Sequence, residues 1–206
     1  MTDLLKGYTL LLASKSPRRQ QLISKLGFDV EVVSIDADED IDADVLPSDI
    51  PGILAQRKSM AYSAPIADSH ILLTADTLVV LDDKVLGKPS SREEAYSILS
   101  ALSGKRHQVY TGVCLRAECG SRVFTEATDV CFKNISDYEI NYYLDNYEYM
   151  DKAGSYGIQE WIGYVGVTRI NGSYYNVMGL PVQRLNQELN AFINNENNPY
   201  VDNLIY

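Results

Sequence analysis

The N-terminal part of the chain carries the pattern that most limits the fold: an apolar strand, a tight turn, a helix and a second strand in close succession. Residues 8–13 (YTLLLA) are almost entirely apolar and predict a short buried strand. Ser16 and Pro17 then stand at the N-cap and the first position of a helix, which Gly27 is expected to end before a strand at 28–33. A chain that begins in this way is directed toward alternating strands and helices.

The same alternation continues to the end of the sequence. Capping-box pairs such as Ser91 with Glu94 and Ser136 with Glu139 mark helix starts, and segments with strand-like composition separate the helices. The expected helices lie at about 17–26, 48–64, 91–103, 136–144 and 181–192, and the expected strands at 8–13, 28–33, 71–81, 108–116 and 122–132. This order, with a middle rich in hairpins, predicts an α/β fold with a mixed sheet.

Length and charge narrow the classes of function. The chain has 206 residues, and we expect a single domain over residues 1–206 with a frayed end beyond Asn194. The formal net charge of −10 argues against a general grip on nucleic acid, so an anionic ligand has to be held locally. No segment is apolar enough for a signal peptide or a membrane span, and we expect a cytoplasmic protein with no membrane partner.

Cysteine and histidine usage removes several kinds of site. Cys114, Cys119 and Cys131 form no CxxC pair, which favours buried apolar roles in a reducing compartment over disulfides or a zinc site. His70 and His107 are the only histidines, too few for a histidine-rich metal site and little material for a Ser-His-Asp triad. Chemistry in this chain therefore depends on carboxylates, lysines and arginines.

Two arginines at the start of the first helix indicate a phosphate site. Arg18 and Arg19 occupy the first helical turn, where unpaired amides and the helix dipole already present partial positive charge. Two more positive charges lower stability there unless an anion binds. The alternative is that both arginines are exposed and have no ligand.

Asp76 and Lys88 are two further candidates for a functional site. Asp76 lies in the apolar segment LLTADTLVV, where a buried carboxylate needs a divalent cation, a lysine or a water that it deprotonates, unless it only accepts backbone hydrogen bonds. Lys88 lies between a glycine and a proline, a restrained backbone that either aims its ammonium into a cleft or leaves it on the surface. The glycine-rich loop 151–159 ends in Gln159, whose amide is suited to a base edge.

Seven blocks of the sequence, taken in order, closely resemble the Maf family of nucleoside triphosphate pyrophosphatases. They are LASKSPRR (12–19), ADT (75–77), LGKP (86–89), LSGKRH (102–107), TG (111–112), DKAGSYGIQ (151–159) and GSYYNVMGLP (172–181). The resemblance implies an inosine-triphosphatase-like α/β fold, with a mixed twisted sheet, flanking helices and two lobes around a central cleft. It also implies a divalent metal cation, Mg²⁺ or Mn²⁺, a homodimer, and hydrolysis of the bond between the α- and β-phosphates of a nucleoside triphosphate.

The resemblance also assigns roles to individual residues, each of the required type. The residues that it implies for substrate binding are Ser14, Arg18, Arg19, Lys58, Thr77, Lys88 and Gln159. Those that it implies for metal binding are Glu39 and Asp76. Asp76 is also the implied general base. Asp38 and Asp40 compete with Glu39 for the role of metal-site carboxylate.

The loop that ends in Gln159 and the following GSYYNV segment resemble the branch of the family that acts on dTTP and UTP. The branch that acts on 7-methyl-GTP carries glutamate at this position. An amide offers a donor and an acceptor to the imide edge of a pyrimidine, so we expect dTTP and UTP as substrates. Modified pyrimidine triphosphates are also possible substrates. Gln159 is followed here by Glu160, Trp161 and Ile162, whereas small residues are more usual at these positions in the family. The alternatives are a 7-methyl-GTP pyrophosphatase and a regulatory nucleotide-binding protein linked to cell-division arrest.

Overall fold

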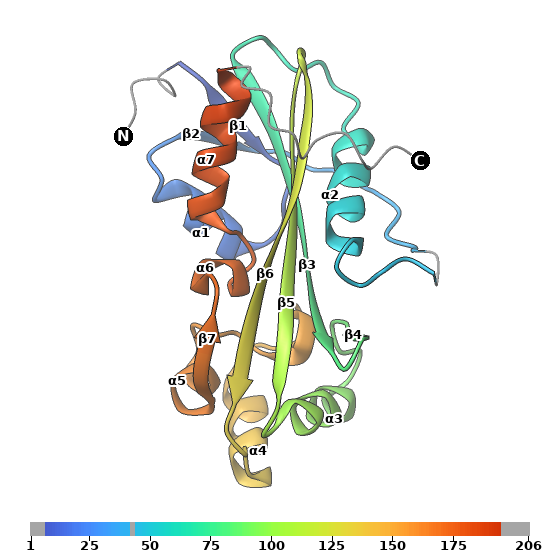
Figure 1. Ribbon diagram of the computed structural model, residues 1–206, viewed down its shortest axis with the longest axis vertical. Coiled ribbons are helices and arrows are strands. Elements are labelled where there is room, and N and C mark those ends of the chain that lie inside the picture. Colours follow the sequence, from blue (N-terminus) through green and yellow to red (C-terminus); the bar gives the residue numbers. More distant parts are fainter. Residues whose placement is uncertain (1–6, 42–43, 195–206) are drawn as a thin grey trace.

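The computed structural model describes residues 7–41 and 44–194, which form one twisted mixed sheet flanked by helices (Figure 1). The strands are β1 (Thr9–Leu12), β2 (Asp29–Val32), β3 (His70–Leu81), β4 (Lys84–Leu86), β5 (Arg106–Ala117), β6 (Gly120–Phe132) and β7 (Val167–Asn171). The helices are α1 (Pro17–Ser24), α2 (Ile50–Ala61), α3 (Arg92–Leu102), α4 (Asp137–Asn146), the 3-10 turn η2 (Ala153–Ser155), α5 (Trp161–Gly166), α6 (Tyr174–Val177) and α7 (Val182–Ile193). The predicted α/β class is confirmed.

The N-terminal unit forms as expected at one end of the sheet. Neighbouring strands follow the order β2-β1-β3-β5-β6-β7, with β4 paired to β3. β1 pairs in parallel with both β2 and β3. Pro17 begins α1 as predicted, but the Ser16 side chain makes no capping hydrogen bond. The first amides of α1 are therefore left for another acceptor.

Three long antiparallel strands, β3, β5 and β6, run along the molecule and link two hydrophobic cores (Figure 1). At one end, α1 and α7 pack on the sheet around Leu73, Leu115 and Leu185. At the other end, α3 and α4 pack around Leu99 and Ile140. Because side chains alternate along a strand, Thr74 points to the opposite face from Leu73, and its hydroxyl donates to the Ala55 carbonyl of α2 at 2.6 Å. α2 therefore covers the face that α1 and α7 leave open.

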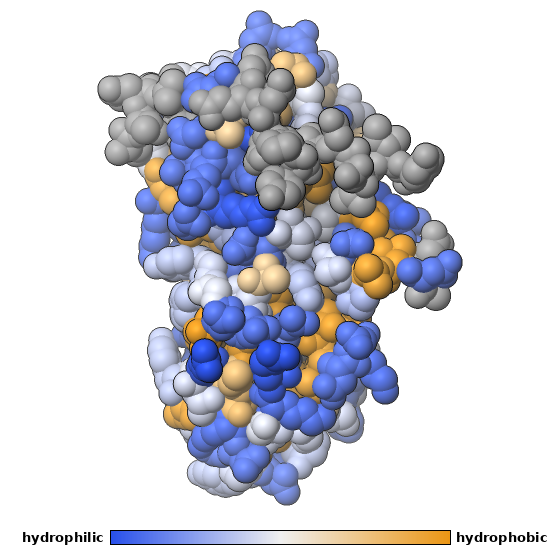
Figure 2. All heavy atoms as spheres, in the orientation of Figure 1, coloured by the Kyte–Doolittle hydropathy of each residue, from blue (hydrophilic) through white to orange (hydrophobic). Residues whose placement is uncertain are grey.

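The surface of the molecule is mainly hydrophilic on the face that Figure 2 shows. Hydrophilic residues cover most of the face seen in Figure 2, and apolar residues show there in separate spots. No helix in the described part of the chain is long and apolar enough to cross a membrane. The frayed end that we expect beyond Asn194 lies outside the described residues.

The structure differs from the sequence prediction mainly in its short elements. β4, η2, α5, β7 and α6 were not predicted, and each has six residues or fewer. Such short segments carry too few periods of a hydrophobic pattern to be recognised. The cysteine prediction is wrong in one respect: Cys114 is buried, but Cys119 is exposed in the turn between β5 and β6 and Cys131 is half-buried. A turn exposes its residues to water whatever their polarity.

Candidate active site

A cavity of about 360 Å³ opens at the edge of β3, where that strand lacks a neighbour. β1 pairs with β3 only as far as Leu73, and β4 begins to pair at Val79. The interval contains Asp76 and Thr77. Every site residue predicted from the sequence lines this cavity: Ser14, Arg18, Arg19, Glu39, Lys58, Asp76, Thr77, Lys88 and Gln159. The competitors of Glu39 in the acidic run, Asp38 and Asp40, do not line it.

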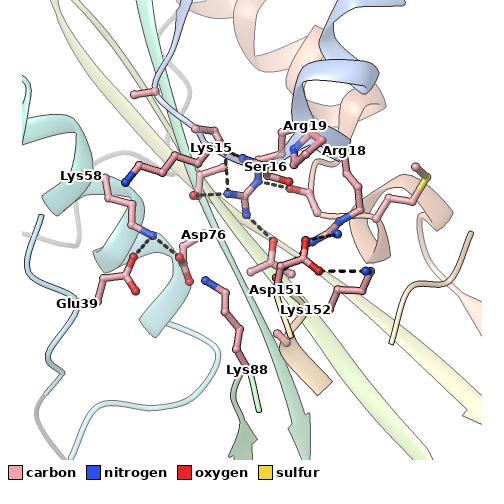
Figure 3. A pocket seen from close by; sticks show the side chains of 18 of the residues that line it. Lys15, Ser16, Arg18, Arg19, Glu39, Lys58, Asp76, Lys88, Asp151 and Lys152 are labelled. Carbon is pink, nitrogen blue, oxygen red and sulfur yellow. Dashed lines mark hydrogen bonds and ion pairs between the residues drawn. The ribbon is translucent and has the colours of Figure 1, made fainter. Parts of the chain in front are cut away.

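The cavity gathers positive charge in a chain that is acidic as a whole. Its cationic side chains are Lys15, Arg18, Arg19, Lys58, Lys88 and Lys152, against the carboxylates Asp36, Glu39, Asp76 and Asp151. Lysine and arginine side chains enter from both sides of the cavity (Figure 3). This local excess is the arrangement that the net charge of −10 requires of any site for an anion.

Lys58 joins the two carboxylates that were predicted for the metal site. Its ammonium nitrogen lies 2.5 Å from Asp76 Oδ1 and 2.7 Å from Glu39 Oε1 (Figure 3). Both Lys58 and Asp76 are largely buried, whereas the Glu39 side chain is 56% exposed. The hydrogen bond from Lys58 lowers the pKa of Glu39, although partial burial opposes that effect. Of the partners considered for Asp76, the structure supplies the lysine.

Arg19 is held almost entirely by the protein. Its Nε donates to the Gly179 carbonyl at 2.8 Å, Nη1 to the Ala75 carbonyl at 2.9 Å, and Nη2 to Thr77 Oγ1 at 2.9 Å. Burial lowers the pKa of Arg19, and the nearby Asp76 carboxylate opposes this shift. Arginine stays charged in proteins, so a fixed positive charge lies behind the open edge of β3.

Arg18 is held more loosely, on the other side of the cavity. Its Nη1 lies 2.8 Å from Asp151 Oδ2, and Asp151 Oδ1 lies 3.0 Å from the Lys152 ammonium. Burial raises the pKa of Asp151, but the bonds from Lys152 and Arg18 outweigh it and the net shift is downward. The sequence does not distinguish Arg18 from Arg19. The structure separates them into one arginine that an anion can draw from a carboxylate and one that is fixed.

The remaining predicted cations and hydroxyls also face the cavity. The Lys88 ammonium points into it (Figure 3) and makes no hydrogen bond or ion pair with any described residue. Ser14 Oγ accepts from the Ser16 amide at 3.2 Å, so its own hydrogen is free to donate. Lys15 and Lys152 were not predicted to act, although both stand inside the motifs LASKSPRR and DKAGSYGIQ.

Thr77 and Gln159 occupy the wall between these charges. The Thr77 hydroxyl receives a hydrogen bond from Arg19 and lies 2.9 Å from Thr111 Oγ1, which in turn donates to the Asn176 carbonyl at 3.1 Å. Gln159 Oε1 is buried without a hydrogen-bond partner among the described residues. A buried acceptor without a donor is costly in a protein, so Gln159 Oε1 is an unsatisfied polar atom beside the cavity.

Glu39 and Asp76 fit a divalent cation that arrives with a phosphate ligand. Their oxygens are the donors that Mg²⁺ prefers, and Mg²⁺ is commonly held by one or two carboxylates together with substrate phosphates. Within the described part of the chain no group of three or more acidic, histidine or cysteine side chains could hold a metal by itself. The donor set therefore suits a shared site better than a resident ion.

Comparisons with known proteins show which proteins this chain resembles over most of its length. The family profile described as "Maf-like protein" matches residues 9–192. A protein of Parabacteroides distasonis named "dTTP/UTP pyrophosphatase" is 53% identical over 193 residues, which cover 93% of this chain and 100% of that protein. A protein of the same name from Bacteroides thetaiotaomicron is 52% identical, with 90% and 96% covered. Among solved structures, the Staphylococcus aureus Ham1 protein gives a TM-score of 0.46 at 13% identity, with 92% of this chain and 100% of that chain covered.

Proposed function

Because this chain belongs to the family of Maf-like proteins, we propose that it is a nucleoside triphosphate pyrophosphatase that converts dTTP and UTP to the monophosphate and pyrophosphate. The observation that carries the proposal is the carboxylate of Asp76, held by Lys58 inside a cavity lined with cations. A triphosphate needs the cations, and hydrolysis needs a group that orients and deprotonates water.

The triphosphate lies along the cationic wall. Arg18 and Lys88 are the side chains with the most freedom to reach phosphate oxygens. Arg18 has to break only its ion pair with the half-exposed Asp151, and Lys88 has no partner to give up among the described residues. Ser14 donates its hydroxyl hydrogen in the turn after β1. Arg19, fixed by backbone carbonyls, contributes positive charge and one remaining N–H of its Nη2.

Asp76 is the general base. A water oxygen attacks the α-phosphorus, its proton passes to the Asp76 carboxylate, the bond from phosphorus to the bridging oxygen breaks, and pyrophosphate leaves with that oxygen. Lys58 holds the carboxylate in place and offsets the charge that develops on the phosphate oxygens. A divalent cation held by Glu39 and Asp76 would supply further neutralisation of the phosphates.

The base is selected by Gln159. The imide N3–H of thymine or uracil is a donor, and the unpaired Gln159 Oε1 is an acceptor without a partner among the described residues. Cytosine has no hydrogen at N3 and presents a lone pair there, so an acceptor placed opposite N3 would stay unpaired with CTP. A site built to pair a buried polar group rejects a ligand that leaves it unpaired by large factors, about 10⁴ or more in well-formed cases.

The alternatives differ in what they require of this cavity. A regulatory protein that only binds nucleotides has no need of a carboxylate held at the reacting position, and the Lys58–Asp76 pair therefore favours hydrolysis. A preference for 7-methyl-GTP is disfavoured because Gln159 carries a neutral amide. The branch that acts on 7-methyl-GTP carries a negatively charged glutamate at this position. Homodimer formation and a cytoplasmic location stay predictions.

The first experiment is product analysis with purified protein and Mg²⁺. The panel contains dTTP, UTP, CTP, 7-methyl-GTP and modified pyrimidine triphosphates, and monophosphate, diphosphate and pyrophosphate are separated. We expect monophosphate and pyrophosphate from dTTP and UTP, and loss of turnover when EDTA removes the cation. Binding without turnover of any triphosphate would contradict the proposal and favour the regulatory role.

A further inference from the structure

Glu160 lies just beyond the loop that carries Gln159 and makes two contacts that hold this loop. One carboxylate oxygen lies 3.1 Å from the Lys152 ammonium. The other accepts a hydrogen bond from the Tyr143 hydroxyl of α4. The Tyr143 oxygen accepts in turn from the Gly157 amide at 3.1 Å. Glu160 and Tyr143 together therefore connect Lys152 and Gly157 of the 152–159 segment to α4.

Lys152 depends on this carboxylate. Its side chain is only 5% exposed, and its ammonium also contacts Asp151 Oδ1 at 3.0 Å and the Glu148 carbonyl. A buried ammonium has to be paired, because an uncompensated buried charge is strongly destabilising. Asp151 is shared with Arg18 across the cavity, so Glu160 supplies Lys152 with a second carboxylate, from beyond Gln159.

Gly157 shows how closely Glu160 and Gln159 pack. A Cβ at Gly157 would lie 2.7 Å from Glu160 Cδ and 2.9 Å from Gln159 Nε2. The carboxylate and the amide thus both lie against the same glycine, which leaves no room there for a side chain. The unpaired oxygen of the same amide, Gln159 Oε1, is the one assigned to the base.

We propose that Glu160 is a positioning residue for base selection: by holding Lys152 and Tyr143 together, it fixes the loop so that the Gln159 amide meets the pyrimidine edge. This inference deepens the proposed function and depends on it for the identity of the base. Burial and the Glu160 carboxylate both raise the pKa of Tyr143, which keeps its hydroxyl as a donor. Glu160 itself does not touch the substrate.

The test is a double-mutant cycle between Glu160 and Gln159. Dissociation constants for dTTP and CTP are measured without a divalent cation, and kcat/KM for both with Mg²⁺, for the protein as it stands, Glu160→Gln, Gln159→Ala and the double variant. We expect Glu160→Gln to lower the dTTP:CTP preference by about tenfold, within the range of coupling between residues in one hydrogen-bonded network. In the Gln159→Ala background the same change should have almost no effect on the preference.

Two further variants separate positioning from general damage to the fold. Tyr143→Phe removes one contact of Glu160 and keeps both charges, and should lower the preference in the same direction. Glu148→Gln removes an equal charge from an exposed side chain just before this loop and should leave the preference unchanged. Thermal unfolding is followed for each variant. A merely structural defect weakens the binding of dTTP and of CTP by the same factor, so it leaves the dTTP:CTP preference unchanged.

The outcomes are distinct. An unchanged preference in Glu160→Gln, or an equal change in both backgrounds, would overturn the inference, as would binding by the unaltered protein that does not distinguish dTTP from CTP. If the unaltered protein prefers dTTP in binding but hydrolyses nothing, the proposed function fails, and the cycle of dissociation constants still decides the role of Glu160.

Discussion

Replacing Asp76 by asparagine tests the centre of the site with little change in shape. The Asp76 side chain is 14% exposed and lies 2.5 Å from the Lys58 ammonium. The asparagine amide fills the same volume but cannot take a proton from water at neutral pH. Loss of a general base lowers turnover by about 10²- to 10⁴-fold, and this is the fall in kcat that we expect for Asp76→Asn.

The effect on stability should be much smaller than the effect on turnover. Breaking a buried ion pair completely costs about 3–5 kcal/mol because it leaves an unpaired charge. Here Lys58 keeps Glu39 at 2.7 Å, and the asparagine oxygen can still accept a hydrogen bond. We therefore expect the free energy of unfolding to fall by about 1–3 kcal/mol, the cost of weakening one hydrogen bond to a charged group.

Binding of the nucleotide should survive the substitution. Asp76→Asn removes a negative charge from a cavity that takes a polyanion, so the dissociation constant of dTTP without a divalent cation should stay the same or decrease. Pyrophosphate release, titration calorimetry and thermal unfolding measure the three quantities. Asp83→Asn, an exposed substitution in the turn after the same strand, is the matched control. Turnover at the original rate, or a loss of binding as large as the loss of turnover, would refute the role of Asp76.

Three other substitutions test separate parts of the structure. Gln159→Glu removes the amide donor and adds charge, so kcat/KM for dTTP should fall about 10- to 100-fold relative to 7-methyl-GTP; an unaltered substrate ratio would remove Gln159 from base selection. Gly112→Ala would place a Cβ 2.1 Å from the Pro51 backbone, displacing α2 with Lys58. Its unfolding free energy should fall by about 1–3 kcal/mol and its turnover should decrease, whereas unchanged values of both would contradict that close packing. Burial lowers the pKa of His107 to about 4, while the unfolded chain binds the proton near pH 6.5. About 3 kcal/mol of stability should therefore be lost as pH falls from about 6.5 to 4. In urea titrations, His107→Gln should lose less over that range, and parallel curves would show that His107 does not titrate as described.

The main elements of the fold could be predicted because their patterns are local. Each expected helix and strand lies within three residues of an observed one, since apolar period, capping pairs and glycine stops act over a few residues. The Ser136–Glu139 capping box forms completely. In contrast, β7 is a mostly exposed strand whose backbone pairs with β6, and its sequence does not reveal this partner.

The motifs were enough to predict nine residues that line one cavity, but they did not single out Lys15 or Lys152, and they did not show what each residue touches. The sequence by itself determined that the chain is an α/β protein, that its chemistry depends on carboxylates, lysines and arginines, and that Asp76, with apolar neighbours, needs a partner. Only the tertiary structure decided that this partner is Lys58, that Arg19 is fixed while Arg18 pairs with Asp151, and that Glu160 holds the loop of Gln159. The physical reason is distance along the chain: hydrophobic periodicity acts between near neighbours, whereas an ion pair such as Arg18–Asp151 joins residues 133 positions apart and exists only after the sheet and its helices have packed.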